Sequence, residues 1–377
     1  MLNSFVNEIR RIFKDPGVTV IFIVATLAYP LIYKTIYWNE QITNVPVAVV
    51  DLSNSPQSRA FLHAWNAAPD IRLTHTCTSM AEAEMLLRDQ KVHGIIYFPR
   101  DFAQQLADPL GQAHISLFCD MSSFLYMKAI YLSCNQVMLE SMRNIQIDRY
   151  EQMGVGKEFA WALVQDAPYH ETALFTPTGG YGSFLIPAVL MMILHQTLFF
   201  GICMLGGTAR EENLDQYSFS SLVGRACAYF TVYYGLSAIL LGFYPRLFDI
   251  PHIGSIGDIF LLIVPYLLAV IFFSMCVSVF IRNRESGLVL LISSSLIFLF
   301  IAGISWPKEM IPDAWWYIAC CIPYTHGAHA FIHINSMGAP LALVSREYTA
   351  LWILAAVYFL IACGLFYLRR TQKQALE

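Results

Sequence analysis

The spacing of the long apolar segments constrains this chain more than any other feature of its sequence. One apolar segment covers residues 18–38, and about five more lie between residues 184 and 368. A helix that crosses a hydrocarbon layer of ~30 Å needs about 20 apolar residues, and each segment approaches that length. Residues 39–178, between the first segment and the second, have the mixed pattern of a soluble domain. We therefore expect a polytopic membrane protein with a large domain on one side of the bilayer.

Composition and charge agree with this class. The chain has 377 residues, of which 56% are hydrophobic and only 13% are charged, whereas a soluble domain usually has about 25% charged residues. The net charge is −4 and no basic stripe with interleaved aromatic residues is present, so nucleic acid is not an expected partner. The first apolar segment is longer than the core of a signal peptide, which is about 7–15 residues, and therefore reads as an uncleaved anchor.

The nine cysteines form no metal-binding pattern. Cys77, Cys119 and Cys134 lie in the soluble block, where at most one pair could close, and the sequence does not choose it. Cys320 and Cys321 are adjacent, so they are either two packed thiols or a vicinal disulfide.

Basic residues beside the spans predict the orientation, because such residues accumulate on the cytoplasmic side. With six spans, every basic cluster falls on one side, and both termini are cytoplasmic. The inserted domain is then extracytoplasmic, as is an outer half-helix segment at 303–347. The clusters are Arg10, Arg11 and Lys14; Arg210 and Arg225; Arg282 and Arg284; and Arg369, Arg370 and Lys373.

Residues 1–17 have two interpretations. Phe5, Ile9, Ile12 and Phe13 fall near one helical face, which predicts a short amphipathic helix in the cytoplasmic interface, ended by the Asp-Pro-Gly at 15–17. The alternative is a simple basic flank of the first span.

The soluble block shows strands alternating with helices, which predicts a small sheet covered by helices. It contains no phosphate loop, nucleophile elbow or His–Glu zinc motif. Asp51 and Asp120 each follow a strand, where they either bind a ligand or, as we prefer, cap a turn. The expected strands are 45–50, 71–76, 93–98 and 114–119, and the expected helices are 55–66, 79–90, 100–107 and 122–152.

Six fragments, in order along the chain, resemble the membrane subunit of type-2 ABC exporters, specifically the subgroup with a large extracytoplasmic domain between spans one and two. The cytoplasmic loop departs from the family pattern, because Gly207-Thr208 precedes Arg210-Glu211-Glu212 and no proline closes the loop. The fragments are VAVVDLSNSPQSR (47–59), GIIYFPRDF (94–102), SLFCD (116–120), TPTGGYGSFLIPAVLMMILHQT (176–197), GTAREENLDQYSFS (207–220) and GISWPKEMIPDAWWYIACCIPYTHGAHAFIHI (303–334).

The resemblance implies a helical membrane domain with an inserted α/β domain, located in the bacterial inner (plasma) membrane. It also implies two protein partners, a separate ABC ATPase subunit and a second permease subunit in a homo- or heterodimer, and it leaves open whether a periplasmic adaptor is required. The chain lacks the G-x-x-x-x-G-K-[ST] motif, so it is not expected to be an enzyme by itself. We expect no cofactor on this chain, with ATP and Mg used by the partner subunit.

Two groups of residues are candidates for function. The resemblance suggests that Arg210, Glu211 and Glu212 dock the ATPase, with Glu8 and Arg11 of the N-terminal helix helping to transmit its motion; the alternative for the loop is a solvated turn. His195, Gln196 and Ser294 lie inside predicted spans, where they either line the transport path or bond a neighbouring helix.

A third group, His326, His329 and His333, would share one face of a helix. These histidines could bind a metal, but we prefer an interfacial half-helix without metal because no carboxylate or cysteine supports the trio. The function expected overall is export driven by a partner ATPase. The alternatives are a receptor that binds ligand in its external domain, and an intramembrane enzyme, for which the sequence has no catalytic motif.

Overall fold

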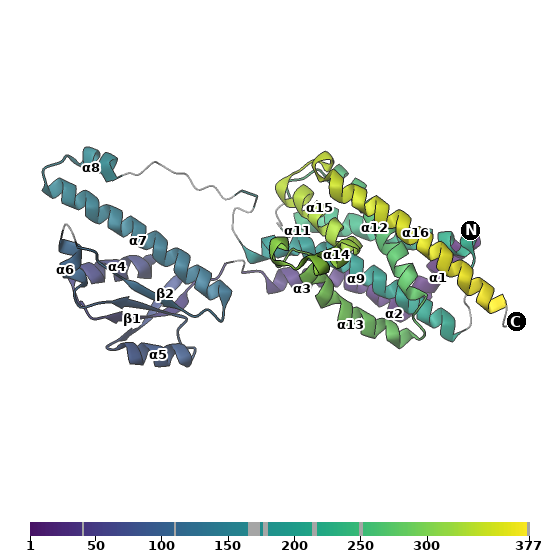
Figure 1. The fold of residues 1–377 in the computed structure, drawn as a ribbon, viewed down its shortest axis with the longest axis horizontal. Coiled ribbons are helices and arrows are strands. Elements are labelled where there is room, and N and C mark those ends of the chain that lie inside the picture. Colours follow the sequence, from purple (N-terminus) through teal and green to yellow (C-terminus); the bar gives the residue numbers. More distant parts are fainter. Residues whose placement is uncertain are drawn as a thin grey trace. The chain divides into compact units, whose positions relative to one another are not determined.

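The computed structural model describes residues 1–39, 41–108, 111–164, 174–175, 180–212, 217–248 and 252–374, and for residues 287–288, 290–292 and 373–374 it describes the backbone only. The chain divides into two compact units. One consists of Met1–Glu40 with Ala173–Glu377, and the other is Gln41–Thr172. Figure 1 shows both units, with each helix and strand coloured by its place in the sequence.

The inserted unit is a four-stranded sheet covered by helices, as the alternation of strand and helix patterns predicted. Helix α8 was not predicted. The elements are β1 (Val45–Asp51), α4 (Pro56–Ala67), β2 (Ile71–Cys77), α5 (Met80–Arg88), β3 (Gly94–Phe98), α6 (Phe102–Ala107), β4 (Ser116–Cys119), α7 (Phe124–Gln152) and α8 (Lys157–Val164).

The sheet is mixed and has the strand order β2-β1-β3-β4. Strand β1 lies parallel to β2 and to β3, and β4 closes the edge antiparallel to β3. Helix α5 covers one face of the sheet, and α4 and α7 cover the other (Figure 1). Side chains of β1 alternate between the two faces: Val47 packs into the core under α4 and α7, and Ala48 into the core under α5.

Local hydrogen bonds explain where helices begin in this unit. Asp51 ends β1, and its Oδ1 accepts hydrogen bonds from the backbone N–H groups of Ser53 and Asn54, at 3.0 and 2.9 Å. The Oγ of Ser55 accepts from the N–H of Ser58 at 3.1 Å and thereby caps α4. Asp51 is therefore engaged in shaping the turn that leads into α4.

The second unit is a bundle of helices. Its elements are α1 (Leu2–Lys14), α2 (Pro16–Thr19), a π-helical segment (Val20–Ala25), α3 (Thr26–Ile36), α9 (Tyr181–Glu211), α10 (Phe219–Ser237), a second π-helical segment (Ala238–Phe243), α11 (Tyr244–Leu247), α12 (Ile256–Ser278), α13 (Arg284–Ile301), a 3₁₀ turn (Lys308–Met310), α14 (Asp313–Cys320), α15 (Pro323–Met337), a 3₁₀ turn (Leu341–Val344) and α16 (Ser345–Gln374).

Among the described residues, five helical stretches are long and apolar enough to cross a membrane. They are Pro16–Ile36, Tyr181–Glu211, Phe219–Leu247, Ile256–Ser278 and Leu341–Gln372. Helix α13, with 18 residues, occupies the place of the remaining predicted span. The structure thus supports a helical membrane unit with an inserted α/β domain after its first span, and the count of six spans stays a prediction.

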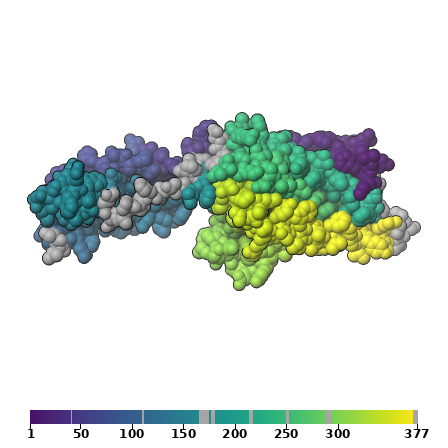
Figure 2. Space-filling model, turned by 90° about the horizontal axis from the view of Figure 1, so that it is seen from above, coloured from purple at the N-terminus to yellow at the C-terminus, as the bar shows by residue number. Residues whose placement is uncertain are grey.

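Helix α9 forms the centre of the bundle. All of its apolar window is buried, compared with 22% for the first span and 22% for the stretch that ends in α16. Figure 2 shows α16, in yellow, along the surface of the bundle. Between Trp352 and Leu368 its exposed side chains are apolar or aromatic, with Ile353 and Leu360 among them. In a bilayer such side chains face lipid or another protein.

Two glycines of α9 allow neighbouring segments to pack directly against its backbone. A Cβ at Gly201 would lie 1.7 Å from the ring of Phe22, and a Cβ at Gly207 would lie 2.8 Å from the backbone of Asn283. Phe22 also packs edge-on against Tyr229 and Tyr233 of α10. The first span and the turn before α13 are therefore seated directly on the backbone of α9.

One sequence expectation about this unit needs correction. We expected a cytoplasmic loop over 207–220, but α9 continues to Glu211, where Arg284 bonds Thr208 and Glu211, and α10 begins at Phe219. Residues 213–216 of that expected loop lie outside the described residues. Helix α1 buries Glu8 and Ile12, while Phe13 is exposed; its position in the cytoplasmic interface stays a prediction.

Candidate coupling site

A turn between α1 and α2 places a carboxylate at the end of the bundle where α9 finishes. Asp15 has an extended backbone, and its Oδ1 accepts hydrogen bonds from the N–H groups of Gly17 and Val18, at 3.0 and 3.2 Å. Pro16 follows at the first helical position, where its missing N–H has no consequence. The Asp-Pro-Gly sequence therefore ends one helix and caps the next.

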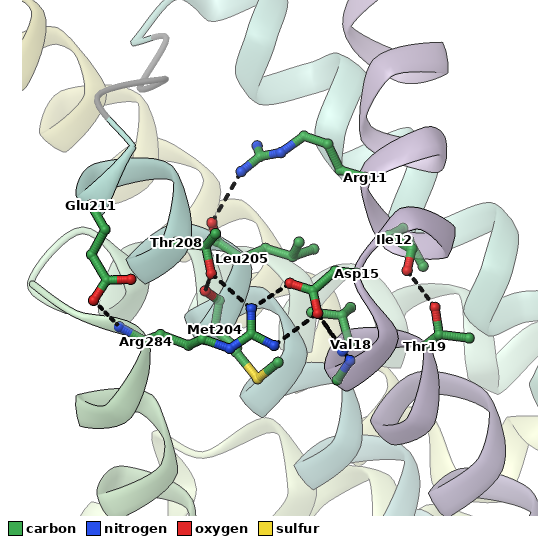
Figure 3. A network of polar contacts seen from close by, with 11 residues as sticks. Arg11, Ile12, Asp15, Val18, Thr19, Met204, Leu205, Thr208, Glu211 and Arg284 are labelled. Atoms are coloured by element: carbon green, nitrogen blue, oxygen red, sulfur yellow. Dashed lines mark hydrogen bonds and ion pairs between the residues drawn. The ribbon is translucent and has the colours of Figure 1, made fainter.

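Arg284, the first residue of α13, binds this carboxylate. Its Nη2 donates to Asp15 Oδ1 at 2.8 Å and its Nη1 donates to Asp15 Oδ2, a bidentate arrangement (Figure 3). Nη1 also donates to the Thr208 hydroxyl at 3.2 Å, and the backbone N–H of Arg284 donates to Glu211 Oε1 at 3.3 Å. We call Asp15, Thr208, Glu211 and Arg284 the Asp15 cluster; it joins the α1–α2 turn, the end of α9 and the start of α13.

The charge of Arg284 changes the acidity of Asp15. Hydrogen bonds from the guanidinium, more than the bonds to Val18 and Gly17, hold the pKa of the Asp15 carboxyl below its ordinary value, against the opposing effect of burial. Asp15 is consequently ionised at neutral pH and can pair fully with Arg284.

A second cluster, which we call the Glu8 cluster, fixes α1 to α10. Glu8 is 3% exposed and accepts a hydrogen bond from the Tyr229 hydroxyl. Its Oε2 lies 3.2 Å from Arg11 Nη1 and 3.7 Å from Arg225 Nε. Near these ion pairs α1 packs closely against the backbone of α10. A Cβ at Gly224 would lie only 2.7 Å from the Cβ of Ser4, so this contact requires glycine.

Arginines also bind backbone carbonyl groups near the ends of helices. The carbonyl groups in the last turn of a helix have no partner within it, and arginine side chains can satisfy them. Arg210 Nη2 donates to Ser278 O at the end of α12, and its Nε donates to the Tyr217 hydroxyl at 3.1 Å. Arg369 Nη2 donates to Val279 O at 3.2 Å, just after α12. Arg11 Nη2 donates at 3.3 Å to Leu205 O, a carbonyl inside α9 and not in its last turn.

These contacts show where the predicted coupling residues lie. Glu8 and Arg11 face the bundle, Arg210 reaches the end of α12, and Glu211 reaches the start of α13. Glu212 is exposed at the end of α9. Sequence reasoning missed Asp15, Arg284 and Tyr229 as members of the same site. The sequence analysis treated Asp15 only as part of the turn that ends the first helix, and Arg284 only as a basic residue beside a span. The Asp-Pro-Gly sequence does indicate an ordered turn, which would hold the Asp15 carboxylate in a fixed place.

The predicted path residues lie deep in the bundle. His195 is fully buried in α9, and its ring is 5.5 Å from Phe298 of α13 and 6.0 Å from Phe273 of α12, measured between centroids. Among the described residues neither of its ring nitrogens has a hydrogen-bond partner. Gln196 is buried beside it and donates to Met192 Sδ at 3.7 Å. Ser294 is buried in α13.

The three histidines near the end of the chain do share helix α15, and two of them bond backbone carbonyl groups. The ring Nε2 of His326 lies 2.9 Å from Cys320 O, and that of His329 lies 2.8 Å from Ala302 O. In the part of the chain that the structure describes, no group of three His, Cys, Asp or Glu side chains is arranged for a metal. The absence of a metal at this trio stays a prediction.

The geometry defines a class of protein: a multi-span membrane protein with a soluble insertion and paired charges at one end of its helices. A family model described as ABC-2 family transporter protein matches residues 17–363. The chain therefore belongs to the ABC-2 family, as the resemblance in its sequence predicted. Permeases of this family lack nucleotide-binding domains and work with ABC ATPase subunits. No curated protein matches the chain at a significant level.

Proposed function

We propose that this ABC-2 permease is the membrane subunit of an ATP-driven exporter and that the Asp15 and Glu8 clusters carry the motion of its ATPase to the spans. The observation that supports this most directly is the bidentate Arg284–Asp15 pair. Together with the bonds from Arg284 to Thr208 and Glu211, this pair joins the α1–α2 turn, the end of α9 and the start of α13. A displacement of the end of α9 would therefore move three helices together.

The distribution of basic residues supports a cytoplasmic position for this end. Arg11, Arg210, Arg284 and Arg369 bond groups at the ends of α9 and α12 or in the α1–α2 turn, so all four belong to the same end of the bundle. Arginines beside spans mark the cytoplasmic side. On this basis the protein has six spans with α13 as the fifth, both termini inside, and the inserted domain outside the cytoplasm.

The proposed assembly contains two permease subunits and two ATPase subunits in a bacterial inner membrane. ATP and Mg are bound by the ATPase, and no cofactor is bound by this chain. The inserted domain guides the exported substrate away or receives a periplasmic adaptor. Within the assembly, the exposed Glu212 and the neighbouring Glu211 contact the ATPase, and the Asp15 cluster transmits its closure.

The first test is a pull-down of the tagged, full-length chain in mild detergent, which should recover an ABC ATPase. The second measures binding of that ATPase to the Glu211→Ala/Glu212→Ala variant. Truncating charged members of a partly buried interface costs about 2–5 kcal/mol of binding, so the dissociation constant should rise at least tenfold.

The matched control is Glu309→Ala/Asp313→Ala, which removes the same charge from exposed positions in the segment that we place on the opposite side. This variant should bind the ATPase as the unmodified chain does. Equal affinity for the ATPase in all three proteins would rule out the end of α9 as the docking element, and would make α1 the next candidate.

A further inference from the structure

The inserted unit contains a cavity of about 610 Å³ beside the edge strand β4. Its walls come from β4 and the residues on either side of it, from the first half of α7, and from Trp65 of α4 and Ile96 of β3. Ligand-binding pockets commonly have volumes of about 300–1,000 Å³, so this cavity is large enough for an organic molecule of moderate size.

The floor and the mouth of the cavity differ in exposure. Trp65 and Ile96 are completely or almost completely buried, whereas Met121 is 73% exposed and Tyr131 is 54% exposed. The cavity is thus open to its surroundings on one side and ends against the hydrophobic core of the domain. A molecule could enter from outside the domain without any unfolding of the sheet.

The lining is almost entirely apolar and has no charged side chain among the described residues. Asn135 is its one amide. The indole N–H of Trp65 donates to Cys134 O at 3.3 Å and offers no free hydrogen to the cavity. Burial raises the pKa of the Cys134 thiol to about 12, so this side chain is neutral at physiological pH. A water molecule needs about two to four polar partners in such a site, and the lining supplies few.

Sulfur is unusually frequent in the lining. Met121, Met127 and Met138 contribute thioethers, and Cys119 and Cys134 contribute thiols. Methionine side chains are unbranched and polarisable, so they adapt to apolar ligands of different shape and pack well against aromatic rings. The cavity is therefore suited to apolar groups in general more than to one rigid shape.

We propose that this cavity binds an uncharged apolar organic molecule, or the apolar part of an amphiphile, as the substrate leaves the membrane unit. The proposal rests on the exporter function for its physiological meaning. The binding itself is a property of this chain alone, and it can be measured without the ATPase.

The probe that tests the proposal is benzophenone, an uncharged aromatic ketone, with the full-length chain in lipid nanodiscs. On illumination its carbonyl oxygen takes a hydrogen atom from a nearby C–H group, and the two carbon radicals join, so the adduct retains every atom of both partners. Peptide mass spectrometry locates the adduct. We expect adducts at residues 115–138 whose yield saturates with probe concentration and falls when diphenylmethane competes.

Asn135→Trp should occupy part of the cavity and lower this labelling about tenfold at subsaturating probe, which corresponds to about 1.4 kcal/mol of lost binding free energy. Asn144→Trp, also on α7 but outside the lining, should leave it unchanged. Leu117→Asn, which puts an amide into the wall, and Leu125→Asn, outside the lining, form a second pair if the first variant does not fold. Far-UV circular dichroism checks folding.

Three results would overturn the proposal: labelling that rises linearly without saturation, adducts confined to the spans, or equal labelling of a cavity variant and its control. These results are distinguishable from a failure of the proposed function. A chain that binds its ATPase through Glu211 and Glu212 but shows no saturable adduct is an exporter subunit without this site. A chain with the adduct but no ATPase retains the site and loses the exporter role.

Discussion

At the scale of single residues, Glu8 is the carboxylate on which the N-terminal helix depends. It is 3% exposed and lies beside Arg11, Arg225 and Tyr229. Removing one member of a buried ion pair leaves the charge of its partner buried and unpaired. This typically lowers the free energy of unfolding by about 3–5 kcal/mol. Glu8→Ala should therefore lower the thermal stability of the purified protein substantially. Glu8→Gln, which keeps an acceptor for the Tyr229 hydroxyl, should lower it less.

The control for this prediction is Arg10→Ala on the same helix, because Arg10 is exposed. Its melting temperature should stay close to that of the unmodified protein. If Glu8→Ala melts at the same temperature as Arg10→Ala, the Glu8 cluster does not hold α1 against α10.

The Asp15–Arg284 pair predicts a dependence on pH. Bonding to Arg284 lowers the pKa of Asp15 in the folded state. A lowered pKa gives stability that is fully present above the ordinary value of about 3.9 and is lost as pH falls through the folded value. Asp15→Asn keeps a capping side chain but removes the charge. At pH 7 it should be less stable than the unmodified protein by about 1 kcal/mol, a modest value because the pair is partly exposed.

Melting curves from pH 7 to pH 3 measure this effect. The difference in melting temperature between Asp15→Asn and the unmodified protein should narrow toward pH 3, as Asp15 itself becomes protonated. A difference that stays constant over this range would mean that the charge of Asp15 does not contribute.

At the scale of elements, glycines on α9 determine how closely its neighbours pack. A methyl group at Gly201 would overlap the ring of Phe22, whereas a methyl group at Gly235 of α10 would meet no atom within 4 Å. Gly201→Ala should cost about 1–3 kcal/mol through overpacking. Gly235→Ala should be neutral or add up to about 1 kcal/mol, because alanine favours helix. The two variants add the same methyl group at different places, and their melting temperatures can be compared directly. Equal melting temperatures would mean that close packing of Phe22 on Gly201 does not contribute to stability.

The elements also show how far sequence reasoning reaches. The bounds of strands β1, β2 and β3 were predicted to within about one residue, because β-branched runs such as Val45–Val50 favour a strand wherever they occur. The start of α5 was predicted for a similar reason: its capping residue Ser79 bonds a backbone group only three residues away. The end of α9 was not predicted, because polar residues at Thr208–Glu211 resemble a loop in sequence and are held in the helix by Arg284, which is distant along the chain. The burial of Glu8 was missed for the same reason: its partners Arg225 and Tyr229 are on another helix.

At the scale of the whole molecule, the charged clusters and the inserted domain belong to separate units, and the proposed function requires them to lie on opposite sides of the membrane. The proposed orientation rests on the arginines at one end of the bundle. Labelling of single added cysteines by an impermeant maleimide tests it. Gln57 in the inserted domain is exposed, as is Gln372 near the end of α16.

Gln57→Cys should react in intact cells once the outer barrier is opened, and Gln372→Cys should react only after the inner membrane is permeabilised. The unmodified chain supplies the background, since Cys227 and Cys321 are themselves exposed. Reaction of both added cysteines from the same side would contradict six spans, because an odd number of crossings separates residue 57 from residue 372 in that topology. In that case the Asp15 cluster could lie on the side of the membrane away from the ATPase. It could then not transmit closure of the ATPase subunits to α9.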